Sequence, residues 1–296
     1  MKFSALAIFL PLLITFDSYG SNGRLDSLYK AGTNNLYDGN FDEAFNNFYE
    51  RRNLSEQLKD SATLAQSIRY LGEVCRATRQ FDLALMYLNQ ALTISDDIHD
   101  SLSMAKCYNR ISAVKFEQKD VDGTLSFGFK ALRLSDHLGD KENSANTLNI
   151  IGAIYTSTNQ YEIAINYYGR AREAMLTLND QSDLPNILNN IANNYFLLGD
   201  YSKGLPYAEE SFQLASKNHT LVYMLEAARE LSQEYKGLGQ YQKALQFNEK
   251  ADSINELYTA ELKKAEKVAI NLKYQNESTN KRMLFLRQLM KRLNGC

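Results

Sequence analysis

The chain repeats itself every forty residues, and this period constrains the fold more than any other feature of the sequence. Six units follow one another without an insertion, so each position of the period forms a column of six residues. The clearest column holds aromatic residues and one valine: Phe41, Phe81, Val121, Tyr161, Tyr201 and Tyr241. A period of this length is typical of stacked structural units, each of which buries its apolar face against its neighbours.

Two helices are predicted in each unit. Three residues after the aromatic column lies a column of mostly small residues: Ala44, Ala84, Thr124, Ala164, Gly204 and Ala244. A further seven residues on lies another: Arg51, Ala91, Ala131, Ala171, Ser211 and Ala251. Spacings of three and seven belong to one helix face. An earlier helix carries an apolar stripe, seen in the fourth unit at i, i+3, i+4 and i+7 in Leu148, Ile151, Gly152 and Tyr155.

Turn-forming pairs separate the two helices at the same point of every unit: Gly39-Asn40, Arg79-Gln80, Lys119-Asp120, Asn159-Gln160, Gly199-Asp200 and Gly239-Gln240. Residues of this kind, recurring at this spacing, predict that a helix stops there. In the first unit Asn35 and Arg51 depart from their columns. We expect both of them to face solvent, as residues of a terminal repeat do.

Composition and motifs argue against catalysis. The 33 basic and 35 acidic residues nearly cancel, so no overall field draws the chain to nucleic acid or to an anionic membrane. The sequence has no phosphate-binding loop, nucleophile elbow or zinc-protease motif. Three cysteines without C-x-x-C spacing and three scattered histidines indicate no metal site, and we interpret Cys75 and Cys107 as packing residues. We therefore expect no enzyme activity, no cofactor and no nucleic-acid partner.

The first twenty residues have the pattern of a secretory signal peptide. Lys2 supplies the positive start, an apolar run covers residues 3–16, and Ser18-Tyr19-Gly20 gives a small-x-small cleavage site. The run is too short to span a bilayer comfortably. We expect cleavage after Gly20, export to the periplasm or the medium, and no transmembrane span in the mature chain. The alternative is an N-terminal segment that stays uncleaved and anchors the protein.

Residues 259–296 are predicted to form a long C-terminal helix, because residues 252–293 contain neither proline nor glycine. An imperfect apolar seam runs along this segment through Leu257, Leu262, Ala265, Ala269 and Leu272. Such a seam packs on the repeats or pairs with a second copy of the chain, which would make a homodimer. Five basic residues and no acid lie between Lys281 and Arg292, and a solvated charged face explains them more simply than contact with phosphate or lipid headgroups.

The repeat resembles the tetratricopeptide repeat (TPR) of the forty-residue class. The resemblance is carried by the small residue of the first helix, the Gly-Asp-Tyr-like turn and the alanine-rich second helix, and is clearest in residues 146–171 and 186–211. About six units over residues 24–258 share it. It implies an all-α fold, a right-handed superhelix or α-solenoid of helix-turn-helix repeats, followed by the long C-terminal helix.

The resemblance also implies a binding site, because in TPR proteins one face of the first helices lines a concave groove. A polar column recurs on this face every forty residues: Arg69, Asn109, Asn149, Asn189 and Arg229, with Asn193 one helical turn further on. A carboxamide offers a donor and an acceptor, as a peptide unit does, so we expect this ladder to bind an extended peptide. The arginines at its ends would hold carboxylates. Alternatively, the asparagines bond to adjacent helices and set the superhelical pitch.

The junction after the last repeat resembles the linker that follows periplasmic TPR arrays in bacterial sensors, which continue into a histidine kinase, regulator or diguanylate cyclase. We interpret the chain as a non-catalytic, exported scaffold that binds a protein or peptide and serves as the sensory module of a signalling system. Two alternatives remain open. One is a structural or dimerisation module, and the other is a truncated remnant of a TPR sensor kinase or regulator.

Overall fold

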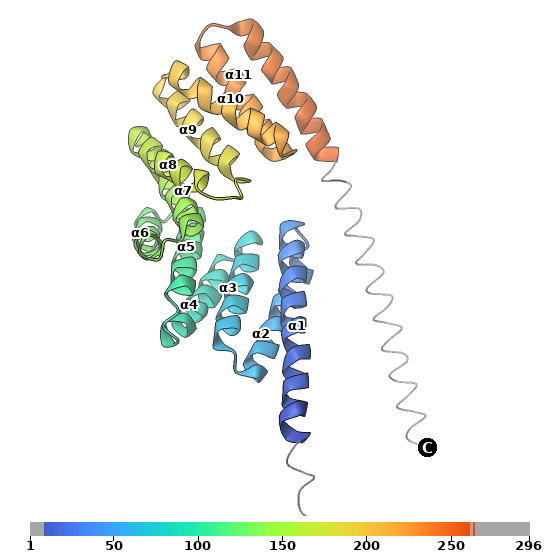
Figure 1. Ribbon diagram of the computed structural model, residues 1–296. Coiled ribbons are helices and arrows are strands. Elements are labelled where there is room, and N and C mark those ends of the chain that lie inside the picture. Colours follow the sequence, from blue (N-terminus) through green and yellow to red (C-terminus); the bar gives the residue numbers. More distant parts are fainter. Residues whose placement is uncertain (1–8, 261–262, 264–296) are drawn as a thin grey trace, which may run out of the picture.

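The computed structural model describes residues 9–260 and residue 263, and within these residues every secondary-structure element is a helix (Figure 1). Eleven helices are labelled: α1 (Phe9–Tyr37), α2 (Phe41–Leu58), α3 (Ser61–Ala77), α4 (Phe81–Asp97), α5 (Ser101–Glu117), α6 (Val121–Leu138), α7 (Lys141–Ser157), α8 (Tyr161–Leu176), α9 (Leu184–Leu198), α10 (Tyr201–Lys217) and α11 (Leu221–Gly237). A further helix, here called the terminal helix, covers residues 241–260.

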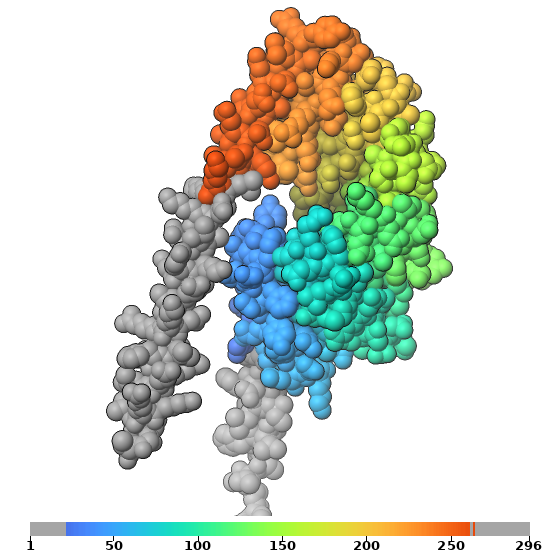
Figure 2. Space-filling view, turned by 180° about the vertical axis from the view of Figure 1, so that it is seen from behind, coloured from blue at the N-terminus to red at the C-terminus, as the bar shows by residue number. Residues whose placement is uncertain are grey.

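Each unit contributes a first helix with an odd number and a second helix with an even number, the terminal helix being the second helix of the sixth unit. Consecutive helices pack against each other along the whole array, and each first helix from α3 to α9 also contacts the next first helix. The array curves, and Figure 2 shows open space between its blue N-terminal and orange C-terminal helices. The predicted all-α solenoid is confirmed.

A residue in the left-handed conformation ends nearly every helix. Within each unit it is the first member of the predicted turn pair, with φ between 60° and 77° at Gly39, Arg79, Lys119, Asn159, Gly199 and Gly239. Between units it recurs at Lys59, His99, Gly139 and His219. The N–H of the following residue then bonds back to a carbonyl of the last helical turn, as Gln80 N does to Cys75 O at 2.8 Å. The turns therefore recur every twenty residues.

The connection between α8 and α9 is the exception to this spacing among the described residues. It takes up residues 177–183, and α9 starts with Pro185 in its first turn. Proline suits the first turn of a helix because its missing N–H would have no intrahelical partner there. The longer connection brings Asp183 to the start of α9, where its carboxyl caps no backbone N–H.

Small and large residues alternate across the contact between the two helices of a unit. A Cβ atom on Gly152 would lie 2.7 Å from Cε1 of Tyr168, and one on Gly72 would lie 2.8 Å from Cγ of Leu88. In the third unit both positions are small, and a Cβ atom on Gly128 would lie 3.2 Å from Oγ of Ser112 and 3.1 Å from Cγ1 of Ile151 on α7. A side chain of the next unit therefore packs where the second and fourth units have Leu88 and Tyr168, and close helix packing is kept.

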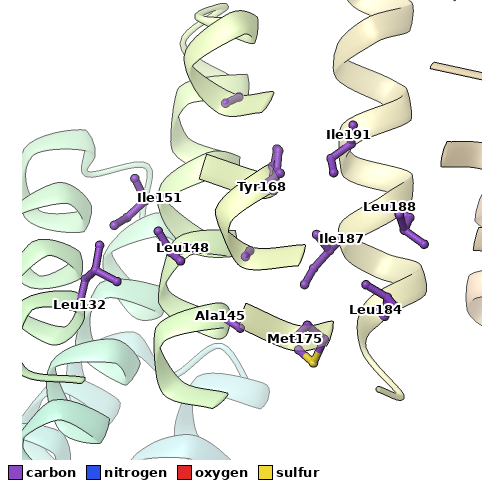
Figure 3. Packing of buried hydrophobic residues seen from close by; sticks show 12 residues of the cluster. Leu132, Ala145, Leu148, Ile151, Tyr168, Met175, Leu184, Ile187, Leu188 and Ile191 are labelled. Atoms are coloured by element: carbon purple, nitrogen blue, oxygen red, sulfur yellow. The ribbon is translucent and has the colours of Figure 1, made fainter. Parts of the chain in front are cut away.

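The largest group of buried apolar side chains joins the fourth and fifth units. Figure 3 shows that Leu148 and Ile151 of α7 lie near Tyr168 of α8, with Ile187 and Ile191 of α9 on the other side of that helix. All five side chains are at most 3% exposed, so the contact between units is as dry as the contact within a unit. Stability therefore comes from the stacking of neighbours.

Arg51 corrects one prediction. It is only 5% exposed, so the expectation that it faces solvent is wrong. Its guanidinium donates to the carbonyl oxygen of Leu25 at 3.0 Å, to Oγ of Ser67 at 2.9 Å and to Oε1 of Gln66 at 2.8 Å. It also lies over the ring of Tyr29, 5.1 Å from its centroid. Because α1 covers this side of α2, a buried arginine links the first three helices where other units have a small residue.

Cys75 and Cys107 are buried free thiols, as predicted, and burial raises the pKa of each to about 11. None of the described helices is long and apolar enough to cross a membrane. Of the predicted C-terminal seam, Leu257 is 59% exposed, and its remaining members lie outside the described residues. The start of the predicted signal peptide, residues 1–8, lies outside them as well.

Candidate functional site

The first helices form the inner face of the array, and contacts between their polar side chains cross it. Asn109 of α5 is 1% exposed, and its amide donates to Oγ1 of Thr147 on α7 at 2.8 Å. Asn149 of α7 is half-buried, and its Oδ1 accepts from Nδ2 of Asn190 on α9 at 3.0 Å. These two members of the predicted ladder thus bond to adjacent first helices, which is the arrangement that the structural alternative expects.

The remaining asparagines of the ladder are differently placed. Asn189 of α9 is 5% exposed, yet neither its amide nitrogen nor its oxygen has a hydrogen-bond partner among the described residues. Its carboxamide lies against the carboxyl of Glu226 on α11. Asn193, one turn further along α9, is half-buried. A buried carboxamide that makes no hydrogen bond is unusual, because desolvation without a partner costs about 1–3 kcal/mol.

One end of the inner face is cationic. Arg69 of α3 and Lys106 and Arg110 of α5 line a cavity of about 80 Å³ together with Glu142, Asn143 and Asn146 of α7. Arg69 is 6% exposed, and its guanidinium lies over the ring of Tyr70, 4.6 Å from the centroid. The charges of Arg69 and Lys106 have no ion-pair partner among the described residues.

A buried ion pair network holds this cationic end in place. Glu73 of α3 accepts from Nη2 of Arg76 at 2.6 Å and lies 3.6 Å from Nε of Arg110, while Arg76 also pairs with Glu117. Burial alone would raise the pKa of Glu73, but Arg110 and Arg76 outweigh it and lower the pKa to about 2. Glu73 therefore stays ionised, and much of the charge of Arg76 and Arg110 is compensated within the chain.

The other end of the inner face is acidic. Tyr223 of α11 donates its hydroxyl to Oδ1 of Asp183 at 3.1 Å, and Glu226 and Glu230 follow on α11 at i+3 and i+7 from Tyr223. Burial raises the pKa of Glu226, which Asn189 and Arg229 partly oppose. Burial and the neighbouring Glu226 raise the pKa of Glu230 to about 7.

The side chain of Arg229 is exposed and lies in this acidic surrounding. Cations were predicted at both ends of the ladder, but the two ends differ in the charge that surrounds them. Glu226 and Glu230 are visible in the sequence. The partial burial of Glu230 and the position of the exposed Glu226 beside Asn189 depend on the angle at which α11 packs on α9 and follow from no local pattern. Thr147 and Asn190, the partners of Asn109 and Asn149, were missed for the same reason.

The chemistry open to this face is recognition by charge and hydrogen bonding. No three acidic, histidine or cysteine side chains among the described residues are placed to hold a metal ion. His99, His137 and His219 are exposed at or near helix ends. A line of half-buried amides between a cationic end and an acidic end suits a ligand with peptide groups and charges of both signs.

Comparison with known proteins agrees with this architecture. A family model described as tetratricopeptide repeat matches residues 23–97 and 183–254. A comparison with curated proteins found no match. Among solved structures, BtubC from P. vanneervenii is 18% identical with a TM-score of 0.63, over 81% of this chain and 92% of that chain.

Two further structures share the fold at similar distance. The Rap conjugation gene regulator of the plasmid pLS20, in complex with the Phr* peptide, is 13% identical with a TM-score of 0.59, over 88% of this chain and 80% of that chain. A Signal Transduction ATPase with Numerous Domains from Pyrococcus horikoshii, which has a tetratricopeptide repeat sensor, is 14% identical with a TM-score of 0.63, over 83% of this chain and 38% of that chain.

The family model matches the two ends of the array and leaves residues 98–182 between them unmatched. The structure places the same helix-turn-helix units across that middle segment, with α5–α8 following α4 in unbroken sequence. The forty-residue columns run through all six units in one register. On these grounds the chain is a tetratricopeptide repeat protein.

Proposed function

We propose that the protein is a non-catalytic scaffold whose inner face binds an extended peptide or a peptide segment of another protein. The observation that carries the proposal is the row of amide side chains from Asn149 to Asn193, half-buried between ends of opposite charge. Peptide groups can take up the hydrogen-bonding capacity of such side chains without regard to the ligand's side chains. The pLS20 regulator, which shares the fold, is itself in complex with a peptide.

The predicted ladder divides into two parts under this proposal. Asn149 and Asn193 are half-buried and accessible enough to meet a ligand, although Oδ1 of Asn149 also accepts from Asn190, and Arg69 borders the cationic cavity where a ligand carboxylate would lie. Asn109 holds α5 to α7 through Thr147 and contributes to the pitch of the array. Asn189 and Arg229 belong to the acidic end.

A capture experiment with the full chain tests the proposal. The double variant Asn149→Ala, Asn193→Ala should lose partner capture from extracts of the producing cells. Its melting temperature should stay within a few degrees of wild type, because Asn190, the donor to Asn149, is half-buried and water can replace the lost acceptor. Asn109→Ala should instead lower the melting temperature, because Thr147 loses a donor, at a cost of about 1 kcal/mol. The exposed Asn89 on α4 supplies the control variant Asn89→Ala, which should change neither property. If the double variant captures the partner as well as wild type does, the asparagines of the ladder have only a structural role.

We further propose that the protein is exported and senses its ligand outside the cytoplasm. The N-terminal charge, apolar run and small-x-small site of residues 1–20 support export, and a sensor built on the same fold supports the sensory role. Expression in a Gram-negative host should yield a periplasmic product whose N-terminal sequence begins near Ser21. A soluble cytoplasmic product that retains Met1 would contradict export, and an intact product in the membrane fraction would favour the uncleaved anchor.

A further inference from the structure

The acidic end of the inner face contains more carboxyl groups than the chain itself can pair. Glu226 and Glu230 lie one helical turn apart on α11, and Asp183, just before α9, is held on the same side by its hydrogen bond with Tyr223. Oε2 of Glu230 is buried and has no hydrogen-bond partner among the described residues. Like charges one turn apart on a helix repel each other, so this arrangement is unfavourable as it stands.

An independent observation indicates that the acidic end binds a ligand. The side chain of Asn189 is 5% exposed, its oxygen has no hydrogen-bond partner among the described residues, and its amide nitrogen lies toward Glu226, whose pKa it lowers. Its oxygen can accept a hydrogen bond from an incoming N–H group, and the carboxylates beside it supply negative charge. The described residues hold no group of three side chains placed for a metal ion, which favours an organic cation.

The acidic end also faces the interior of the curved array. Tyr37, at the last residue of α1 and 91% exposed, is close enough to Tyr223 to contribute to the raised pKa of that phenol, which burial and Asp183 raise more strongly. The first and sixth units therefore approach each other around the open space seen in Figure 2. A ligand segment in that space lies within reach of α11.

We propose that Asp183, Asn189, Glu226 and Glu230 form a receptor for a lysine or arginine side chain of the bound peptide. The inference rests on the proposed function and deepens it, because it assigns a charge to the part of the ligand that lies against α9 and α11. A cationic side chain would lie between the two glutamates and donate to their carboxyl oxygens and to Oδ1 of Asn189.

The proposal entails that binding strengthens as the pH rises. The burial that raises the pKa of Glu230 to about 7 keeps most of its population neutral at pH 6, and a cation interacts more strongly with the ionised form. Five charged or titratable groups face this pair. Asp183 comes from the connection before α9, Tyr37 from α1, and Tyr223, Arg229 and Glu234 from α11 itself. Arg229 is the competing cation, but its exposed side chain leaves the pair accessible.

The test uses the full chain and a labelled Gly/Ser peptide with two lysines, blocked at both termini, and fluorescence anisotropy at low salt. Affinity should rise about threefold to tenfold between pH 6 and pH 8.5, since one charge–charge contact near a protein surface is worth about 1 kcal/mol. The double variant Glu226→Gln, Glu230→Gln should lose this binding. Both substitutions keep the side-chain shape and remove the repulsion, so the fold should persist, which circular dichroism checks.

Asp252 and Glu256 provide a matched control, because they form an exposed pair of acids at the same i, i+4 spacing on the terminal helix. The variant Asp252→Asn, Glu256→Gln should bind the peptide as wild type does, and the same peptide with both lysines acetylated should not bind. Equal binding of the acetylated peptide, or unchanged binding by the Glu226 and Glu230 variant, would overturn the receptor. A partner whose capture depends on Asn149 and Asn193 but not on the two glutamates would retain the proposed function and reject the cation site.

Discussion

Glu234 of α11 occupies a buried column in which the preceding first helices carry Val74, Val114, Ile154 and Asn194. Its side chain is 0% exposed, and neither carboxyl oxygen has a hydrogen-bond partner among the described residues. A Cβ atom on Gly204 of α10 would lie 2.0 Å from Oε1 of Glu234, so the glycine leaves room for the carboxyl. The two residues depart from their columns together, as a complementary pair.

Burial, with a contribution from Glu230, raises the pKa of Glu234 from its ordinary 4.5 to about 8. No cation among the described residues contributes to the pKa of Glu234: Lys203, beside Gly204 in the sequence, pairs with Asp200 at 2.6 Å, and Lys243 lies over the ring of Tyr235. Between pH 4.5 and 8 the folded state keeps a proton that the unfolded state releases, so the free energy of unfolding falls as the pH rises through this window.

We predict that the free energy of unfolding of the variant Glu234→Gln falls less with rising pH than that of the wild type. Its advantage over wild type in free energy of unfolding should grow between pH 5 and pH 9 by on the order of 1–3 kcal/mol, because a neutral amide replaces a buried charge. Thermal melts at several pH values measure the difference, with Glu249→Gln at an exposed site of the terminal helix as the control. Parallel pH profiles for wild type and Glu234→Gln would show that Glu234 titrates normally.

At the scale of the helix pair, the contact between Gly152 and Tyr168 sets the approach of α7 and α8. Gly152→Ala should lower the free energy of unfolding by about 1–3 kcal/mol, because the added methyl group enters the tyrosine ring. Tyr168→Ala alone should cost about 3–5 kcal/mol through the cavity that it leaves. The double variant should be more stable than the sum of these losses predicts, since it reproduces the Ala192 and Ala208 pair of the fifth unit. Strict additivity in chemical denaturation would mean that the two positions do not share space.

The turns allow a second prediction at this scale. Lys119 ends α5 with φ of 62°, a conformation that places its Cβ close to the following carbonyl oxygen. Lys119→Gly should raise the free energy of unfolding by about 1 kcal/mol, and Gly199→Ala, at φ of 77°, should lower it by a similar amount. Calorimetric melts of the two variants should therefore shift in opposite directions, and shifts of the same sign would contradict the argument.

Most features of the individual helices and turns could be predicted from the sequence, because they depend on contacts between residues less than about twenty positions apart. The turn pairs, the helix faces and the small column at Gly72 and Gly152 are local patterns with a fixed period. Gly128 departs from the column of Leu88 and Tyr168, and no local pattern shows that Ile151 of the next unit packs against it. Arg51 was assigned to solvent because the sequence does not reveal that α1 covers it.

At the scale of the whole molecule, the curvature of the array could not be predicted from the sequence, because it is the sum of small rotations between successive units. These rotations bring Tyr37 of the first unit near Tyr223 of the sixth, and on α11 they bury Oε2 of Glu230 while Glu226 stays exposed. The polar ladder could be found from periodicity alone, but whether each asparagine is free or bonded depends on the distance between first helices. Asn109 and Asn189 occupy one column and differ in this respect because Thr147 faces the first and Glu226 the second.

The junctions between the first four units share one capping arrangement. Asp60, Asp100 and Asp140 each accept the backbone N–H of the residue three positions on, at 3.0 to 3.1 Å. Each follows a residue in the left-handed conformation and begins a first helix, so the chain enters α3, α5 and α7 through the same local geometry. Joining Asp60 directly to Ser101 would recreate that junction with one unit fewer. Evolution can therefore add or remove whole forty-residue units without a new kind of helix start. Such a change alters the length of the inner face, and with it the length of ligand that the face can span.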